Sequence, residues 1–177
     1  MDTEHLDRAI NAGSELCNAL LEPLHATFGQ VSIRSAFRSK SINDLGNRKK
    51  RNCSRNEANF AHHIWDEADD DGVGATACIV LPWFMDKYRD GADWRALAYW
   101  IHDHLPYSGL EFFDGEGMCS FNISWHEKPK KTVTGYMPTK TVLLKDAHDK
   151  RGFAEWYAGF PPLATSVEPM YRRTWRE

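Results

Sequence analysis

The sequence predicts an α+β fold, in which a small and mostly antiparallel sheet has helices packed on one side. Three patterns favour this class. Apolar residues recur every three or four positions over 4–27, as on an amphipathic helix, and polar and apolar residues alternate over 31–37, as on a strand with one buried face. Two further apolar runs, over 107–113 and 118–125, flank a turn rich in glycine and acidic residues and predict a β-hairpin.

The remaining elements follow from the same two periodicities and from helix caps and breakers. In chain order we expect the helix over 4–27, the strand over 31–37, a short helix capped by Ser39 or Ser41 and stopped by Gly46, a buried strand over 75–81 closed by Pro82, a helix over 93–104 capped by Asp93, the hairpin, and short strands over 132–136 and 140–144. The helices are expected to cover one face of the sheet.

The chain is expected to divide into a domain over 1–135 and a C-terminal extension over 136–177. The last 25 residues mix aromatic residues, prolines and arginines, which cannot form a core alone but are too aromatic to be left in water. We therefore expect an extended arm that packs back on the domain, docks on a protein partner or mediates self-association.

Composition argues against two classes of function. A net charge of -3 disfavours a general nucleic-acid binder, which needs a basic surface. No apolar run is long enough to span a membrane, and the acidic, polar N-terminus differs from a secretory signal, so synthesis in a cytoplasm without a signal peptide is expected. The four scattered cysteines suit reduced thiols.

Residues 47–56 form the one strongly basic run of the sequence. Such a run is typical of a solvated loop, and the alternative is a contact with an anionic partner or wall polymer. Both interpretations stay open at this stage.

The segment Phe37-Arg38-Ser39-Lys40-Ser41-Ile42-Asn43 resembles the aromatic-Arg-Ser-x-x-aliphatic-Asn motif of the zinc D-alanyl-D-alanine peptidase family. That family includes DD-carboxypeptidases, D,D-dipeptidases and phage endolysins. The order of elements over about residues 20–130 is also similar to the family, with a histidine-containing acidic block, a strand, a helix, and a strand pair that ends at His126. The resemblance implies a DD-peptidase-like fold with a zinc site.

Two registers of the family's metal motif compete in this sequence. In the first, His63 and Asp70 have the family's spacing and, with His126, would hold Zn. In the second, the glycine and strand over 74–82 match better, which places Asp71 and Cys78 in the ligand positions instead. Histidine nitrogen, carboxylate oxygen and thiolate sulfur are all ligands that zinc accepts.

The resemblance also implies roles in substrate binding and catalysis. Arg38 would orient the substrate carboxylate, with Asn43 beside it in the motif. The family's general base lies three residues before the last histidine, but here that position is Ile123, which accepts no proton. Glu111 and Asp114 on the partner strand are the remaining catalytic candidates, together with a glutamate beside His126.

Two functions follow from these features. One is zinc-dependent hydrolysis of cell-wall peptides, in which His63, Asp70 and His126 hold the metal. The other is a catalytically degenerate member of the same fold that serves as a structural or interaction component, for example of a phage particle or tail that meets the cell wall.

Overall fold

A computed structural model describes residues 3–115, 117–137, 140–143 and 153–164. The elements are α1 (Thr3–Leu16), the π-helical turn η1 (Cys17–Leu21), α2 (Glu22–Phe28), β1 (Ser32–Ser35), α3 (Lys40–Arg48), the 3-10 turn η2 (Asn56–Asn59), β2 (Gly74–Val80), α4 (Pro82–Arg89), α5 (Trp94–His104), β3 (Gly109–Gly115), β4 (Met118–His126), β5 (Thr132–Tyr136), β6 (Lys140–Leu143) and α6 (Ala154–Ala158).

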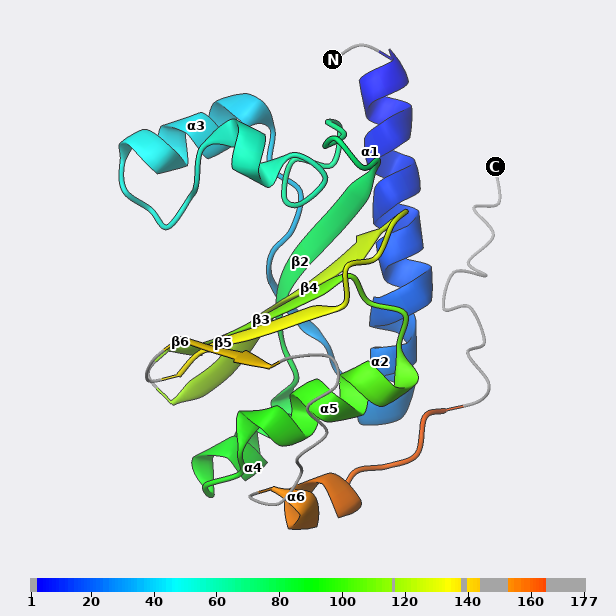
Figure 1. Ribbon diagram of the computed structural model, residues 1–177, viewed down its shortest axis with the longest axis vertical. Helices are drawn as coiled ribbons and strands as arrows, with labels where there is room; N and C mark the ends of the chain where they lie inside the picture. Colours follow the sequence, from blue (N-terminus) through cyan, green and yellow to red (C-terminus); the bar gives the residue numbers. More distant parts are fainter. Residues whose placement is uncertain (1–2, 116, 138–139, 144–152, 165–177) are drawn as a thin grey trace, which may run out of the picture.

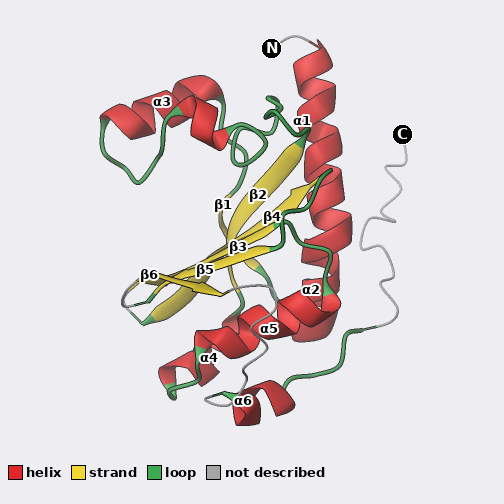
Figure 2. Cartoon of the chain, in the orientation of Figure 1, coloured by secondary structure: helices red, strands yellow, loops and turns green. Residues whose placement is uncertain are grey.

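The strands form a six-stranded sheet in the order β1-β2-β4-β3-β5-β6. All neighbouring pairs are antiparallel except β3 and β5, which are parallel. Figure 2 shows this sheet in the middle of the molecule, with helices around it. The α+β class with a mostly antiparallel sheet, as the sequence predicts, is confirmed.

The N-terminal helix runs beside the sheet along much of the molecule (Figure 1). α1, η1 and α2 follow each other without a break, so the amphipathic helix expected over 4–27 is confirmed, with one π-helical turn inside it. Leu16, Leu20 and Leu24 on its inner side are fully buried. They pack into the main core and fix the helix against the sheet.

Each central strand has one apolar and one polar face, because successive side chains point to opposite sides. The helix face carries Ala77 of β2, Ile123 of β4 and Phe112 of β3, all in the core with the helices. We call the other face the open face. It carries mostly polar side chains: Thr76 and Cys78 of β2, Ser120, Asn122, Ser124 and His126 of β4, and Glu111 of β3, with Val80 and Phe113 as apolar members of the Ser120 row. α3 and the loop after it stand away from α1, beyond the β2 side of the sheet (Figure 1).

One local prediction was incomplete and one was wrong. The buried strand does end before Pro82, but Pro82 also starts α4, since proline without an N–H is well suited to a first helical turn. Gly46 does not stop α3, which is capped by Ser39 as one alternative predicted and continues to Arg48. A Cβ at Gly46 would lie 2.6 Å from the Cys53 sulfur, so the glycine serves the close approach of the following loop.

The described part of the C-terminal extension packs against the helices. Phe160 contacts the rings of Phe28 and Trp83, and the Trp100 indole donates a hydrogen bond of 3.0 Å to the Pro161 carbonyl. The expected boundary at 135/136 falls inside β5. The rest of the predicted arm, at 144–152 and 165–177, lies outside the described residues.

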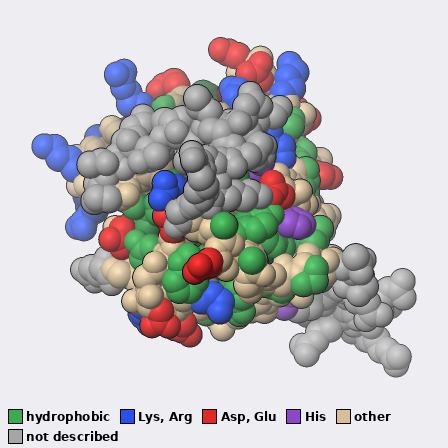
Figure 3. All heavy atoms as spheres, turned by 60° about the horizontal axis from the view of Figure 1, so that its bottom comes forward, with side chains coloured by type: hydrophobic (Ala, Val, Ile, Leu, Met, Phe, Trp, Pro, Cys, Tyr) green, Lys and Arg blue, Asp and Glu red, His purple; other side chains and the backbone are tan. Residues whose placement is uncertain are grey.

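The surface at the α4–α6 end is mixed in character. Figure 3 brings the α4–α6 end forward and shows hydrophobic side chains among charged ones of both signs. No helix in the described ranges is both long enough and apolar enough to cross a bilayer.

Candidate functional site

Polar side chains lie in rows across the open face, because the strands pair in register. Cys78 pairs with Asn122, which pairs with Glu111 on the next strand, and the Asn122 amide donates to the Glu111 carboxylate over 2.8 Å. One step along the strands, the hydroxyls of Thr76 and Ser124 are 2.7 Å apart. The open face therefore offers hydrogen-bonding groups on three adjacent strands.

His63 is held over this face as a neutral imidazole. Its Nδ1 lies 3.0 Å from the Ala36 carbonyl, to which it donates, and its side chain also bonds to Asn122. Burial and then the nearby Arg38 charge lower the pKa of His63 to about 4, against the opposing effect of these hydrogen bonds. His63 is therefore uncharged at neutral pH.

His126, the last residue of β4, binds the acidic loop that precedes β2, residues 66–71. Its Nε2 donates to Asp69 Oδ1 over 3.2 Å, and its Nδ1 accepts a 2.9 Å hydrogen bond from the Lys128 amide. Asp69 Oδ1 also accepts from the amides of Asp71 and Gly72. Partial burial acts to raise the pKa of the Asp69 carboxyl, but the Asp71 amide and His126 outweigh it and lower that pKa.

A glycine makes room for this arrangement. Gly74 pairs with His126 across β2 and β4, and a Cβ there would lie 2.7 Å from His126 Cδ2 and 2.9 Å from the Trp125 carbonyl, besides meeting the Ala61 carbonyl. Position 74 therefore has no room for a side chain.

Two guanidinium groups, of Arg34 and Arg38, lie beside the open face near the middle of β2. Arg34 Nη1 donates to the Ser120 hydroxyl over 2.9 Å, and Arg38 Nη1 donates to the Cys53 sulfur over 2.9 Å. The Arg38 Nε is buried and has no hydrogen-bond acceptor within the described part of the chain. Burial raises the pKa of the Cys78 thiol, while both guanidinium groups act to lower it, so both charges reach the middle of β2.

The first predicted zinc set is not assembled. His126 contacts Asp69 and not Asp70, whose side chain is exposed, and His63 is turned to the Ala36 carbonyl. Among the residues that the structure describes, no three His, Cys, Asp or Glu side chains converge closely enough to hold a metal ion. As they stand, these donors do not fit a zinc site.

The zinc ligands predicted by the second register, Asp71, Cys78 and His126, also lie apart. Asp71 forms an ion pair of 3.1 Å with Lys130. Cys78 pairs with Asn122, four residues before His126 on β4, which places it roughly 13 Å along the strand from His126 at ~3.3 Å per residue. Strand geometry therefore separates Cys78 from the histidine that it was expected to join.

The predicted catalytic and substrate-binding residues are distributed over both faces. Glu111 lies on the open face, whereas Asp114 bonds to Tyr88 of α4 on the helix side. Ile123 is fully buried in the core. Asn43 is buried and bonds to the Ser54 carbonyl and the Asn56 side chain, so it holds the loop after α3.

Sequence reasoning missed Arg34, Asp69 and a role for His62. Glu111, Asp69 and His126 all act on the His62 pKa, which desolvation lowers overall, so His62 lies among these groups. His62 and Asp69 have the same seven-residue spacing as His63 and Asp70. Because two histidines and three aspartates are adjacent in the sequence, the histidine–aspartate pair of the metal motif can be assigned to either of two positions that differ by one residue.

Comparisons with models of protein families, with curated proteins and with solved structures found no match to this chain. The similarity to the zinc peptidases therefore rests on the motif at 37–43 and on the order of elements.

Proposed function

We propose that this chain is a peptide-binding module of the zinc D-alanyl-D-alanine peptidase type, which takes the C-terminal carboxylate of a cell-wall peptide on its open face. The carrying observation is the pair Arg34 and Arg38, whose guanidinium groups flank that face. Neither forms an ion pair with a carboxylate in the described part of the chain. This module would suit a component that meets the cell wall, for example in a phage particle.

A carboxylate would complete the hydrogen bonding of Arg38. The Arg38 Nε is covered by the chain itself, but no carboxylate of the described residues pairs with the guanidinium charge. A guanidinium presents several N–H groups in one plane, which matches a carboxylate with two oxygens. Ligand binding would therefore give the Arg38 guanidinium a carboxylate partner that the described residues do not supply.

The polar rows of the open face would then form hydrogen bonds with the part of the peptide that precedes its C-terminal carboxylate. The side chains of Asn122, Ser124 and Thr76 offer donors and acceptors to peptide amides, and Glu111 at the far end of its row can receive an amino group. The neutral His63 adds no charge that would repel such an amine.

Two features favour binding over hydrolysis. The position of the family's general base is Ile123, whose side chain lies in the core on the opposite face of the sheet. Both ring nitrogens of His126 are engaged, one by Asp69 and one by the Lys128 amide. In this arrangement His126 holds the acidic loop in place.

A titration can test the proposal. We expect an N-acetylated peptide that ends in D-Ala-D-Ala to bind, and the same peptide with a C-terminal amide to bind far more weakly. Arg38→Ala should weaken binding of the acid by about 10- to 100-fold, as loss of a charge-assisted hydrogen bond of ~1.5–3 kcal/mol predicts. Arg38→Lys should recover part of the affinity.

The matched control is Arg89→Ala, which removes an equal charge from the exposed end of α4. It should leave the affinity unchanged. Equal binding of the acid and the amide would contradict the assignment of the arginines to a carboxylate.

A second candidate, zinc-dependent peptide hydrolysis, would need the candidate zinc donors to move closer together, since among the described residues they do not fit a zinc site as they stand. Asp69 contacts His126, and both lie near His62 and Glu111 on the open face. Elemental analysis of the purified chain and of His126→Ala tests it: stoichiometric zinc that disappears in the variant, with release of wall peptides only by the parent chain, would favour the hydrolase.

A further inference from the structure

An apolar groove lies between α1 and the loop residues Phe37 and Trp65. It encloses about 540 Å³ between the helix and the rings of Phe37 and Trp65. Leu6, Ile10 and Phe37 in its lining remain 46%, 54% and 37% exposed, which is high for large apolar side chains. A surface of this kind is typical of an interaction site.

The groove is preformed. The Trp65 indole donates a 3.2 Å hydrogen bond to the Thr76 carbonyl, and its ring lies 5.8 Å from that of Phe37. A Cβ at Gly13 would lie 2.8 Å from the Trp65 ring, so helix and indole approach as closely as glycine allows. A partner would therefore meet a fixed shape.

The described chain ends close to this helix. The Ala164 amide donates a 3.1 Å hydrogen bond to the Thr27 hydroxyl near the end of α2. The following thirteen residues, 165–177, lie outside the described part of the chain, and their sequence contains Met170, Tyr171 and Trp175 among three arginines.

We propose that the C-terminal segment 165–177 of the same chain occupies this groove. From Thr27 back to Leu6 the helix spans about 32 Å at ~1.5 Å per residue. Thirteen extended residues reach about 43 Å, so the segment is long enough to follow the groove to its far end. Its aromatic and methionine side chains match the apolar lining.

The tether supports the same occupant. Because the segment is tethered at Ala164, its effective concentration at the groove is in the millimolar range, which favours its own chain over a second copy.

A disulfide can test this docking, because Cys17 lines the groove and is exposed. In full-length chain carrying Trp175→Cys, mild oxidation should link the introduced thiol to Cys17 within one chain, as peptide mapping of the monomer band would show. The matched control adds Cys17→Ser and Asn11→Cys to the same Trp175→Cys chain. It moves the helix thiol to an exposed position beside the acidic cavity on another side of the same helix. Its crosslink should be at least about tenfold slower, since proximity sets the rate.

A second variant separates docking from chance collision. Ile10→Lys places a positive charge in the exposed apolar lining, where it opposes both the apolar contact and the three arginines of the segment, so it should reduce the Cys17 crosslink severalfold, while circular dichroism confirms an intact fold. Equal rates for the two thiol positions, a product of dimer size only, or no effect of Ile10→Lys would each overturn the proposal. None of these outcomes depends on peptide binding at the open face.

Discussion

The fold strongly disfavours the protonated form of His63. It is 7% exposed, and its pKa is lowered to about 4 by burial and by Arg38. In the unfolded chain a histidine titrates near ~6.5. Between these two values the unfolded chain binds more protons than the folded one, so acid favours unfolding.

The free energy of unfolding should therefore fall by about 3 kcal/mol on account of His63 as pH drops from about 6.5 to 4, and this loss should be complete below pH 4. Urea unfolding at several pH values measures it. His63→Asn, which cannot titrate, should flatten the dependence in this window. An unchanged slope in the variant would show that His63 is not neutral in the folded chain.

Gly74 provides a second prediction at the residue scale. Gly74→Ala should destabilise the fold by about 1–3 kcal/mol or more, because the new methyl group overlaps the backbone of β4 and the His126 ring. Gly115→Ala at the end of β3, where no atom lies within 4 Å of the new Cβ, is the control and should change stability by less than about 0.5 kcal/mol. Thermal unfolding of both variants is the measurement.

The sequence located the site region but not its contacts. Arg38, His63, Glu111 and His126 were expected at the site and do lie on or beside the open face. Pairing His126 with Asp70 and not Asp69 was an error of one position, which no periodicity can correct within a run of three aspartates. Residue type predicts chemistry, whereas the choice between neighbours depends on the loop geometry.

At the scale of elements, long periodic segments were the predictable ones. The N-terminal helix, the helix capped by Asp93, and the hairpin all lie where the pattern placed them. α4 was missed because its residues Pro82–Arg89 follow a buried strand directly, and a proline there can end a strand or begin a helix. In the folded chain the helix packs Phe84 into the core.

The acidic loop between η2 and β2 offers a test of one element. Asp69→Ala removes the acceptor for two backbone amides and for His126, so it should cost about 1–3 kcal/mol and increase hydrogen exchange at residues 69–73. Asp70→Ala, one position along and exposed, should cost less than about 0.5 kcal/mol. Equal effects of the two substitutions would contradict the role given to Asp69.

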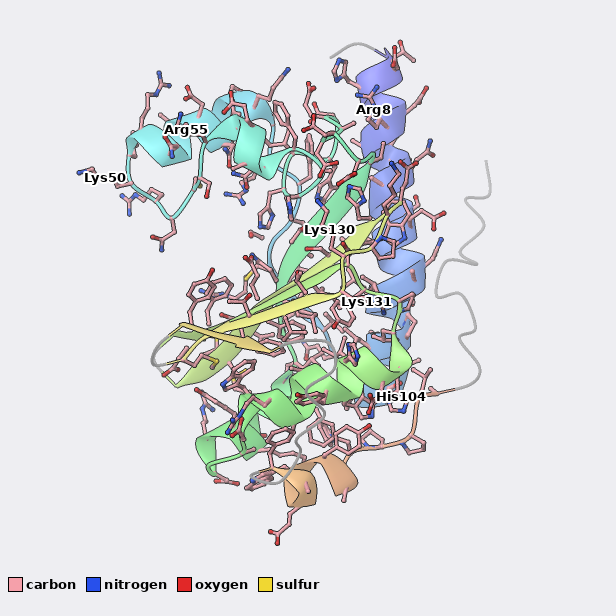
Figure 4. All side chains as sticks on the ribbon, in the orientation of Figure 1. Arg8, Lys50, Arg55, His104, Lys130 and Lys131 are labelled. Carbon is pink, nitrogen blue, oxygen red and sulfur yellow. The ribbon has the colours of Figure 1, made fainter. Side chains whose placement is uncertain are left out.

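At the scale of the whole molecule, the sheet separates stability from recognition. Its helix face joins α1, α2, α4 and α5 in one core, while its open face carries the polar rows and both arginines. The loop after α3 adds Lys50 and Arg55 on the same side as α3, away from Arg8 on α1 (Figure 4). Charge for an anionic ligand is therefore gathered away from the helical core.

Two cysteines report on the two faces. Cys119 on the helix face is buried, and burial raises its pKa to about 12, whereas Cys78 on the open face is half-buried. In the native protein a small alkylating reagent should modify Cys78 at least about a hundredfold faster than Cys119, because the thiolate is the reactive form. Peptide mass mapping measures both rates, and a bound wall peptide should protect Cys78; rapid native labelling of Cys119 would contradict the assignment of faces.

The parallel pairing of β5 with β3 has a consequence for incomplete chains. β3 pairs on one edge with β4, which follows it directly in the sequence. Its other edge pairs with residues 132–136, which come later in the chain. A product that ends before Thr132 would keep most of the core but would leave the edge of β3 unpaired. This edge includes the aromatic residues Phe112 and Phe113. Such an edge is a template for strands of other molecules, so shortened fragments should aggregate while longer ones stay in solution.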